Sequence, residues 1–370
     1  MKYCIFLLFF ASTLFAKEFR YMQRSPRALL MGDAFTALAN DDYTLFYNPA
    51  GLASTTGISF KFFNADLGFS DYYHDQDRFK NFPSTAAGIS NRILGYPIYI
   101  HMGTTPTIKM AGFGFSLLAS NTTTLVLRNA ITPLLEIDYR YDRGFVIGYA
   151  YTLGAFGKKK KDGQGSGTSI GASVKHINRE GLQGTYHLFG TDLISKINTA
   201  NTDNMSTILE SLGHAKGNGW GIDTGVIQTF KKGFSETSFG LSVLDVADTR
   251  FKKTSGTGTV PVQKMTVNAG ASFKQDYKII DYAFSLDLHP LNDAMDYRRK
   301  IHLGFQFGIP LVRAFAGFNA GYVSYGLQLR LWPISILAGF YSAEVGAGFK
   351  QEEAKRAVLY LSLFDFSFDL

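Results

Sequence analysis

Cysteine is almost missing from this sequence. The only cysteine among the 370 residues is Cys4, which lies in an apolar N-terminal stretch. If that stretch is removed, the remaining chain can form no disulfide, no cysteine-bound metal site and no thiol-based active site. A chain without thiols also suits an oxidising compartment, because stray thiols would pair wrongly there.

Residues 1–16 have the layout of an export signal. Lys2 supplies the positively charged start, residues 4–15 form an apolar core, and Ala16 offers a small residue for cleavage. The apolar core is too short to span a bilayer. We therefore expect residues 1–16 to be a cleaved signal peptide, with an uncleaved anchor as the alternative.

Long apolar runs and charged residues are also scarce. No run of about 18 apolar residues follows residue 16, so no membrane-spanning helix is predicted. Charged residues make up only 18% of the chain, whereas it contains 33 Phe, 20 Tyr and 38 Gly. This composition is typical of a β-barrel that touches lipid with every second residue. The formal net charge falls from +7 to +6 when Lys2 is removed, which is too small a bias to indicate nucleic-acid binding.

Apolar and polar residues alternate over many short segments. Phe284 and Leu286, for example, alternate with Ser285 and Asp287. This period-two pattern predicts strands with one large apolar face and one polar or small face. The clearest segments are residues 264–273, 281–289, 302–309 and 323–331.

A soluble β-sandwich would also alternate, but three further features favour a membrane barrel. Tyr282, Tyr325 and Trp220 lie near strand ends, where an interfacial girdle places aromatic side chains. The segments are about ten residues long, which is the length that a tilted strand needs to cross the hydrocarbon. The connections alternate between short and long, as in bacterial barrels. Short connections are expected near Thr104, Lys231, Lys274 and Pro310, long ones at 70–95, 179–218, 247–262 and 289–297, and residues 154–167 are a long exception on the short side.

The pattern predicts sixteen strands, although fourteen remains open because the segments within 122–142 and 311–331 are the weakest. Either even number suits a single-chain bacterial barrel. The expected strands are residues 57–66, 96–104, 108–118, 122–131, 134–142, 144–153, 167–178, 219–230, 235–246, 263–274, 278–288, 299–309, 311–318, 321–331, 333–342 and 356–368.

The sequence contains no convincing catalytic or metal-binding pattern. Ser169 lies in a Gly-x-Ser-x-Gly match, but that match opens an alternating strand and lacks the strand, turn and helix of a nucleophile elbow. A barrel-embedded hydrolase would also need a histidine beside it, such as His176. The seven histidines are scattered without ligand spacing. We therefore expect no enzyme activity, no cofactor and no metal.

Charged residues on the small-residue face would line the barrel lumen. In one interpretation they hydrogen-bond one another inside a filled barrel. In the other, a cation among Lys175, Lys264 and Arg330 holds an anionic head group. The charged residues assigned to this face are Lys175, Asp223, Lys264, Asp281, Asp287, His302 and Arg330.

The segment ahead of the first strand contains a stretch, residues 45–55, that fits neither a strand nor a helix, because Pro49 removes a backbone donor and disfavours the helical conformation for Asn48. It contains Met31 and Gly32, then the stretch 34–37 (Ala-Phe-Thr-Ala), then Asp41 and Asp42. The turn Asn48, Pro49, Ala50, Gly51 and Leu52 follows. In order and spacing this segment resembles the N-terminal plug of the FadL-like family of outer-membrane transporters for long-chain fatty acids and other hydrophobic molecules.

The resemblance implies a fourteen-strand transmembrane antiparallel β-barrel, residues 57–370, with residues 17–56 as a plug inside the lumen. It implies the outer membrane of a Gram-negative bacterium and passive uptake of fatty acids or aromatic hydrocarbons. A gating role is implied for the plug turn, and the alternative is a fixed plug anchor. The residues concerned are Asn48, Pro49, Ala50 and Gly51.

The second half also resembles the PorV-like branch of this superfamily. The stretches "FGLSVLDVADTRF", "VPVQKMTVNAGASF" and "FNAGYVSYGLQL" carry this likeness. It implies a second function, a scaffold or shuttle for secreted or surface-attached proteins. Expected partners are therefore hydrophobic small molecules, outer-membrane lipid or secreted proteins, and no nucleic acid.

Overall fold

The computed structural model describes residues 18–55, 57–72, 75–81, 83–129, 131–154, 164–187, 209–277 and 279–368. The expected signal peptide, residues 1–16, lies outside the described residues, as does most of the 154–167 connection. Helices in the described part are short, and none has the length and apolarity that a membrane-crossing helix requires. They are α1 (Pro26–Leu30), η1 (Thr44–Phe46), η2 (Pro49–Ser54), α2 (Gln76–Phe79), α3 (Ala86–Ile93) and η3 (Tyr297–Lys300).

Nearly all other regular structure is β-strand. The strand segments of the described residues are β1 (Ile58–Ser70), β2 (Ile98–Thr104), β3 (Thr107–Met110), β4 (Phe113–Arg128), β5 (Leu134–Gly154), β6 (Gln164–His187), β7 (Ala215–Lys232), β8 (Ser235–Leu244), β9 (Lys252–Gly256), β10 (Thr266–Asp276), β11 (Asp281–Leu288), β12 (Ile301–Gly308), β13 (Val312–Asn319), β14 (Tyr322–Leu331), β15 (Ile334–Glu344) and β16 (Glu353–Phe368).

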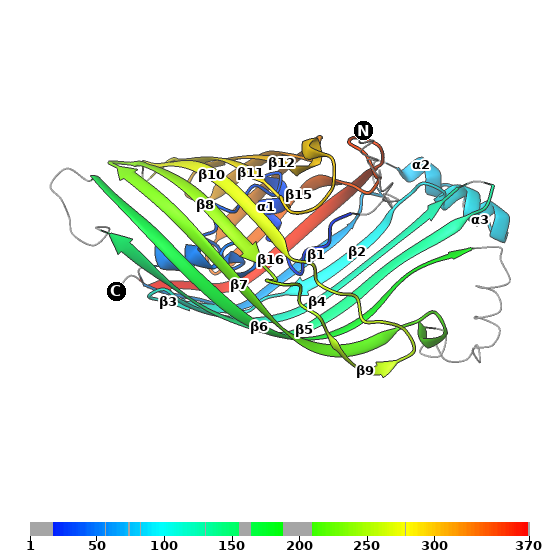
Figure 1. Cartoon of the computed structure of the whole chain (residues 1–370). Coiled ribbons are helices and arrows are strands. Elements are labelled where there is room, and N and C mark those ends of the chain that lie inside the picture. Colours follow the sequence, from blue (N-terminus) through cyan, green and yellow to red (C-terminus); the bar gives the residue numbers. More distant parts are fainter. Residues whose placement is uncertain are drawn as a thin grey trace, which may run out of the picture.

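These segments close into one antiparallel barrel (Figure 1). β16 pairs with β1 from Ile58 opposite Phe368 to Ser70 opposite Arg356, so the sheet has no free edge at this seam. β2 and β3 share one position between β1 and β4, and β9 pairs only with β7. The closed ring therefore has fourteen positions, as the resemblance implies.

Some expected strands merge in the structure. The strands expected at 134–142 and 144–153 are one strand, β5, which runs without a break for 21 residues. The strand expected at 122–131 is continuous with the second half of the one expected at 108–118, and together they form β4, with 16 residues. The expected strand 108–118 is instead divided by a hairpin, because Ala111 and Gly112 both have positive φ (46° and 85°). The expected turn near Thr104 is a break within the β2–β3 position. The doubtful strands between 311 and 331 are both present as β13 and β14.

The alternation predicted from the sequence is confirmed on the barrel wall. Phe284 and Leu286 of β11 are exposed on the outside, whereas Ser285 and Asp287 are buried on the inside. The outer face is apolar over most strands, as contact with lipid chains requires. Trp220 and Tyr325 also point outward, as expected of girdle residues.

The two ends of the barrel differ in their connections. At one end, here called the loop end, most connections are long: 71–97, 188–214, 245–265, 289–300 and 345–352. At the other, the turn end, most are tight: 111–112, 233–234, 277–280, 309–311 and 332–333. The long connection expected at 179–218 is shorter than predicted, because β6 extends to His187 and β7 begins at Ala215. Residues 188–208 of that connection lie outside the described residues.

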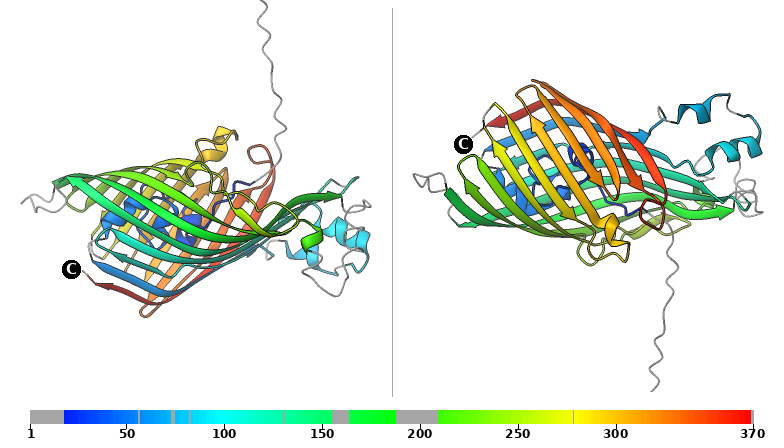
Figure 2. Two further views of the ribbon diagram at one scale, coloured as in Figure 1. Left: turned by 60° about the horizontal axis from the view of Figure 1, so that its bottom comes forward. Right: turned by 90° about the horizontal axis from the view of Figure 1, so that it is seen from above.

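Residues 18–55, here called the plug, lie inside the lumen (Figure 2). The buried hydrophobic core of the molecule consists mainly of plug side chains such as Leu30, Phe35 and Leu45, packed against inward-facing wall residues such as Val146. Full burial of one such side chain contributes roughly 1.5–3 kcal/mol. The core of this protein is therefore the interface between plug and wall.

Candidate functional site

The Asn-Pro-Ala-Gly turn lies deep in the lumen and is organised by one amide. Asn48 is fully buried and caps η2, since its Oδ1 accepts a hydrogen bond from the Ala50 N–H at 3.1 Å. Its Nδ2 donates to the carbonyl of Thr36 at 3.0 Å, within the plug. The same nitrogen lies 3.4 Å from the carbonyl of Val226 and 3.5 Å from that of Leu241 on the wall. Asn48 therefore links the turn both to the rest of the plug and to β7 and β8.

Two glycines of the barrel wall leave the space that this turn occupies. A Cβ atom on Gly225 of β7 would lie 1.9 Å from the Oδ1 of Asn48. A Cβ atom on Gly171 of β6 would lie 2.4 Å from the backbone nitrogen of Ala50. Because real Cβ atoms do not approach other atoms so closely, the turn can seat only where the wall has no side chain.

The same arrangement continues around the lumen. A Cβ on Gly148 would meet Leu45, and one on Gly114 would meet Leu52, in both cases closer than 3 Å. The small face seen in the sequence is thus the socket of the plug, a role that alternation alone does not reveal. Other wall glycines that face plug atoms in this way include Gly240, Gly304, Gly317, Gly326 and Gly339.

The acidic pair of the plug binds the first strands of the wall. The Nζ of Lys61 on β1 lies 2.6 Å from the Oδ2 of Asp42. The Nζ of Lys109 on β3 donates to the carbonyl of Asp41 at 3.0 Å, and the hydroxyl of Ser25 donates to its carboxylate at 2.6 Å. The pair thus joins the plug to the β1–β3 side of the lumen.

Asp287 anchors the opposite side of the plug. Its Oδ2 accepts hydrogen bonds from the backbone N–H groups of Phe35 at 2.7 Å and Thr36 at 2.6 Å. Ser285, two residues earlier on β11, donates to the carbonyl of Ala34 at 2.7 Å. Asp287 was expected to face the lumen, and its position there is confirmed.

One buried group has the composition of a metal site. Possible ligand atoms of Asp33, His289 and His302 lie within 4.8 Å of one another. Asp33, however, already forms an ion pair with Arg24, and His302 Nδ1 lies 2.9 Å from the carbonyl of Gly32. The two imidazole rings are stacked at 3.8 Å with an interplanar angle of 6°, so their nitrogens do not converge on one point. The group is best described as a further anchor between plug and wall.

Lys175 faces the lumen as expected, but its charge is already matched. Its Nζ lies 2.7 Å from Asp223 and 2.8 Å from Asp245, and all three residues are buried. Ser173 adds a hydrogen bond to Asp223 at 3.0 Å. This is the arrangement in which polar residues bond one another inside a filled barrel.

The other two predicted cations lie elsewhere. Lys264 lies before β10 at the loop end, with its side chain 67% exposed and 3.6 Å from Asp248, so it is at the rim and not in the lumen. Arg330 lies near the turn end of β14 and donates to the carbonyl of Ile309 at 2.8 Å. The structure does not bring Lys175, Lys264 and Arg330 together.

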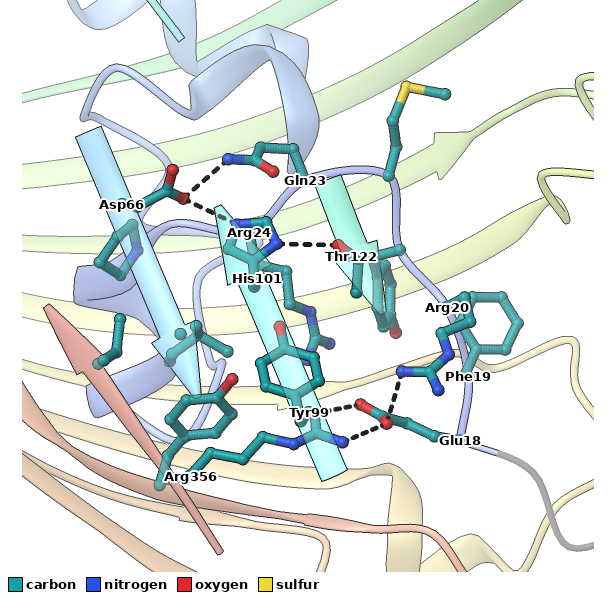
Figure 3. A pocket seen from close by; sticks show the side chains of 17 residues that line it. Glu18, Phe19, Arg20, Gln23, Arg24, Asp66, Tyr99, His101, Thr122 and Arg356 are labelled. Atoms are coloured by element: carbon teal, nitrogen blue, oxygen red, sulfur yellow. Dashed lines mark hydrogen bonds and ion pairs between the residues drawn. The ribbon is translucent and has the colours of Figure 1, made fainter. Parts of the chain in front are cut away.

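Residues 18–24, here called the strap, cross the loop end of the lumen. They border three cavities, one of which is shown in Figure 3. The cavities measure ≈ 60, ≈ 160 and ≈ 50 Å³, and Glu18 lines all three. Arg356 of β16 holds the Glu18 carboxylate with two hydrogen bonds, at 2.8 and 2.6 Å, and Arg20 adds a third at 2.7 Å. Burial raises the pKa of Glu18, but Arg20 and Arg356 outweigh it and the pKa falls to about 2.

Apolar and polar groups meet in the ≈ 60 Å³ cavity. The guanidinium of Arg356 stacks 3.9 Å above the ring of Tyr99. On the far side, Asp66 accepts hydrogen bonds from Gln23 at 2.9 Å and contacts His101 at 3.2 Å. Sequence reasoning missed Glu18 and Arg356. Alternation on the last strand does place Arg356 inward, but nothing local marks Glu18 as its partner.

The segment before β10 closes the loop end further. Gln263 is buried and donates to the carbonyl of Arg20 in the strap at 2.7 Å. Arg179 of β6 donates to the carbonyl of Pro261 at 2.9 Å and forms an ion pair with Asp142 at 2.6 Å. The strap is thus held between the barrel wall and this inward-folded segment.

A larger cavity of ≈ 560 Å³ lies on the turn-end side of the plug. The plug contributes residues 37–40, 50–51 and 53–55 to its lining, and the wall residues include Lys109, Lys231 and Lys274. The Asn-Pro-Ala-Gly turn therefore borders this cavity, whereas the strap borders the cavities at the loop end.

The hydrolase interpretation is wrong. Ser169 is buried in the lumen, with its Oγ 2.8 Å from the Oγ1 of Thr152. His176 lies on the outer face, where its ring is 4.6 Å from that of Trp220. Because positions 169 and 176 differ by an odd number, the strand sends the two side chains to opposite faces.

No protein-family model and no curated protein match this chain. Solved structures do. The toluene transporter TodX of Pseudomonas putida is 11% identical, covers 94% of this chain and 99% of its own, and has a TM-score of 0.48. The CymD monoaromatic hydrocarbon channel is 11% identical, with coverages of 95% and 100% and a TM-score of 0.45. A FadL homologue of Pseudomonas aeruginosa is 10% identical, with coverages of 93% and 98% and a TM-score of 0.32. At such identities and TM-scores these similarities do not identify a solute for this chain.

Proposed function

We propose that this chain is an outer-membrane channel for the passive uptake of hydrophobic solutes, such as long-chain fatty acids or aromatic hydrocarbons. One observation carries the proposal. The plug separates small loop-end cavities from a ≈ 560 Å³ turn-end cavity inside a barrel with an apolar outer face. Bacterial barrels carry long loops outside and short turns in the periplasm, so the loop end faces the exterior of a Gram-negative cell. The sequence shows no energy-coupling motif, so movement would be diffusive.

In this proposal the gate is the turn formed by Asn48, Pro49, Ala50 and Gly51. The turn lies against the wall through the Nδ2 of Asn48, whose two wall contacts are long, at 3.4 and 3.5 Å. Hydrogen bonds of this length are weak. A small shift of the turn would therefore break little and would widen the path toward the turn-end cavity.

A sideways exit is supported by a break in the wall. β1 pairs with β3 up to Lys61 and with β2 again from Asp66. Between these points the side chain of Asn64 makes the hydrogen bonds that a neighbouring strand backbone would otherwise make. Its Nδ2 donates to the carbonyl of Thr105 at 2.9 Å, and its Oδ1 accepts from the Thr105 N–H at 2.7 Å. One side chain thus closes a point where the ladder is interrupted, and its rotation would open the wall toward lipid.

Uptake of a fluorescent fatty acid and of a labelled aromatic hydrocarbon tests the proposal. The assay compares a deletion strain carrying the wild-type chain with the same strain carrying the empty vector. We expect faster entry of at least one solute with the wild-type chain, and the same effect in lipid vesicles that contain the purified protein. Unchanged entry of every hydrophobic solute tried, in both systems, would contradict the proposal.

A second candidate, a scaffold or shuttle for secreted or surface-attached proteins, is favoured by the tall side of the barrel. β5, β6 and β7 have 21, 24 and 18 residues, whereas about 9–11 cross the hydrocarbon. These strands therefore rise beyond the membrane at the loop end, with β9 paired to β7. This function predicts stable protein partners in cross-linked pull-downs and no solute entry in vesicles.

A further inference from the structure

We infer that the outer face of β5, β6, β7 and β9, at the loop end, binds the phosphate and sugar groups of a phosphorylated glycolipid in the outer leaflet of the membrane. The inference goes beyond the proposed uptake function. It shares with that proposal only the orientation of the barrel, with the loop end outside, and it involves neither the lumen nor the plug.

Four polar side chains form one row across these strands. The backbone register places Arg143 of β5 opposite Asn178 of β6, and Asn178 opposite Asn218 of β7. Lys252 of β9 is opposite Asn218 and completes the row, here called the polar row. Neighbouring strands are about 4.8 Å apart, so the polar row is roughly 14 Å wide. It contains two cations and two amides and no carboxylate.

The polar row faces away from the lumen. Arg179, the neighbour of Asn178 in β6, is buried inside the barrel. Because side chains alternate across a strand, Asn178 points outward, where it is exposed. The guanidinium of Arg179 lies 4.5 Å from the ring of Phe251, so Phe251 faces inward and Lys252 outward. Lys252 is exposed and forms no ion pair within the described residues.

The level of the polar row is set by an aromatic cluster beside it. Phe145, His176 and Trp220 occupy the next outward positions toward the turn end, opposite one another. Trp220 is 63% exposed, and its ring lies 4.6 Å from that of His176 and 6.1 Å from that of Phe145. Such aromatic side chains mark the membrane interface. Two residues of a strand rise roughly 7 Å, so the polar row lies at the level of the lipid head groups.

The charge of this face fits phosphate. Glu180, one position further from the aromatic cluster, lies 2.8 Å from Arg143 and 3.0 Å from Lys216. Together with Lys252, three cations therefore share one carboxylate, and the face keeps a positive charge. Arginine binds phosphate through paired hydrogen bonds, and lysine binds it as a point charge.

Two features favour a glycolipid over a simpler anionic lipid. The amides of Asn178 and Asn218 both donate and accept hydrogen bonds, as sugar hydroxyl groups do. β6 also continues past the polar row to His187, so the wall flanks a bulky head group and not only the phosphate level. A phosphorylated glycolipid offers both the charge and the sugar that this face can bind.

Titration of lipid A into the full chain in a neutral detergent tests the inference. The chain has two tryptophans, and Trp332→Phe leaves Trp220, beside the polar row, as the reporter. We expect lipid A to shift the emission of Trp220. Arg143→Gln together with Lys252→Gln should weaken binding about thirtyfold, because each cation near a membrane surface contributes about fivefold. Dephosphorylated lipid A should bind the wild-type residues at least as weakly.

Asn178→Ala together with Asn218→Ala separates the glycolipid from a simpler lipid. Loss of the amides should weaken lipid A binding about fivefold or more and leave the weaker binding of phosphatidylglycerol unchanged. Lys232→Gln is the matched control, because Lys232 is an exposed cation at the opposite end of β7. It should leave lipid A binding unchanged.

Equal affinity for lipid A with and without its phosphates would overturn the inference, and this comparison needs no variant of the polar row. An equal loss in Lys232→Gln and in the Arg143 and Lys252 double variant would overturn it too. Phosphatidylglycerol that binds as tightly as lipid A would show a general anionic lipid surface and would also contradict it. The titration is independent of solute entry, so a failed uptake assay contradicts the proposed function alone.

Discussion

Asn48 shows how much one side chain controls in the lumen. Its Nδ2 faces the carbonyls of Thr36, Val226 and Leu241. Because carbonyl oxygens only accept hydrogen bonds, this position requires a side chain that donates. Asn48→Ala should lower the free energy of unfolding by about 1–3 kcal/mol, because it removes the hydrogen-bond partners of the buried Thr36 carbonyl and Ala50 N–H. Asn48→Asp should cost more, although it has the same shape, because it turns a carboxylate toward these oxygens.

Urea denaturation of the protein in detergent, followed by tryptophan fluorescence, measures both variants. Asn129→Asp is a suitable control, since Asn129 is exposed in the β4–β5 connection and Asp also tolerates its positive φ of 63°. If Asn48→Asp proved no less stable than Asn48→Ala, Asn48 would not act as a donor to the wall.

The pKa of Glu18 predicts the pH at which the strap loosens from the wall. Its pKa of about 2 in the folded chain is below the value of about 4.3 for a free glutamate. A carboxyl group whose pKa is lower in the folded state stabilises that state. The stabilisation is complete when the pH is above the pKa of the unfolded state, and it is lost as the pH falls through the pKa of the folded state. The strap should therefore stay bound from pH 9 to about pH 5 and loosen progressively between about pH 4 and pH 2. The charged and titratable groups around Glu18 are Arg20, Arg24, Arg356, Tyr99 and Tyr341.

A tryptophan introduced as Phe19→Trp reports this transition by its emission wavelength. In the presence of Glu18→Gln the change between about pH 4 and pH 2 should shrink, because the titrating group is gone. An emission shift already complete at pH 6 would show that another group holds the strap.

At the level of elements, the fit between plug and wall depends on glycines in neighbouring strands. Gly225→Ala places a Cβ 1.9 Å from the Oδ1 of Asn48, a buried side chain that is held by hydrogen bonds to Thr36 and Ala50. We expect the turn to be displaced, with a loss of about 1–3 kcal/mol in stability and a change in solute entry. Gly348→Ala is the control, because its nearest neighbour is 3.4 Å away in an outer loop.

Stability in detergent and the uptake assay should be measured on the same preparations. If entry rises in Gly225→Ala while the barrel keeps its resistance to SDS at room temperature, the turn is a gate. If the barrel is destabilised and entry does not change, the turn is a fixed anchor.

The strands that were misjudged from the sequence share a physical cause. The breaks expected at residues 119–121 and at 143 lie beside two stretches that are polar on both faces, Asn121 to Thr124 and Tyr139 to Arg143. In the structure these stretches belong to long strands, so both faces can carry polar groups. The hairpin at Ala111 and Gly112 was hidden because a two-residue turn keeps the alternation in step.

At the level of the whole molecule, the outer face decides whether the barrel lies in lipid. Phe284 is 50% exposed in the middle of β11, a position that would tolerate lysine in water. In a bilayer Phe284→Lys should cost about 2–4 kcal/mol, because the charge lies near the midplane. Tyr297→Lys, at a position 73% exposed in the loop-end connection, should cost little.

Folding into lipid vesicles, measured by the mobility shift of the folded barrel on unheated SDS gels, compares the two variants. Equal folding of Phe284→Lys and the wild-type chain would argue that this face is in water. Such a result would remove the basis for an uptake channel, whatever the plug does.

The sequence by itself determined the strand periodicity and the apolar outer face of a barrel, and its resemblance to a known family added the N-terminal plug and the number of strands. These features depend on neighbours in the chain: a period of two fixes the face of each side chain, and Asn48 and Pro49 define a turn locally. Only the tertiary structure decided which residues meet, such as Glu18 with Arg356, Asn48 with Gly225, and Lys175 with Asp245. Alternation tells which side of the wall a residue faces, but its partner depends on strand register and on the path of the plug, which join residues far apart in the sequence.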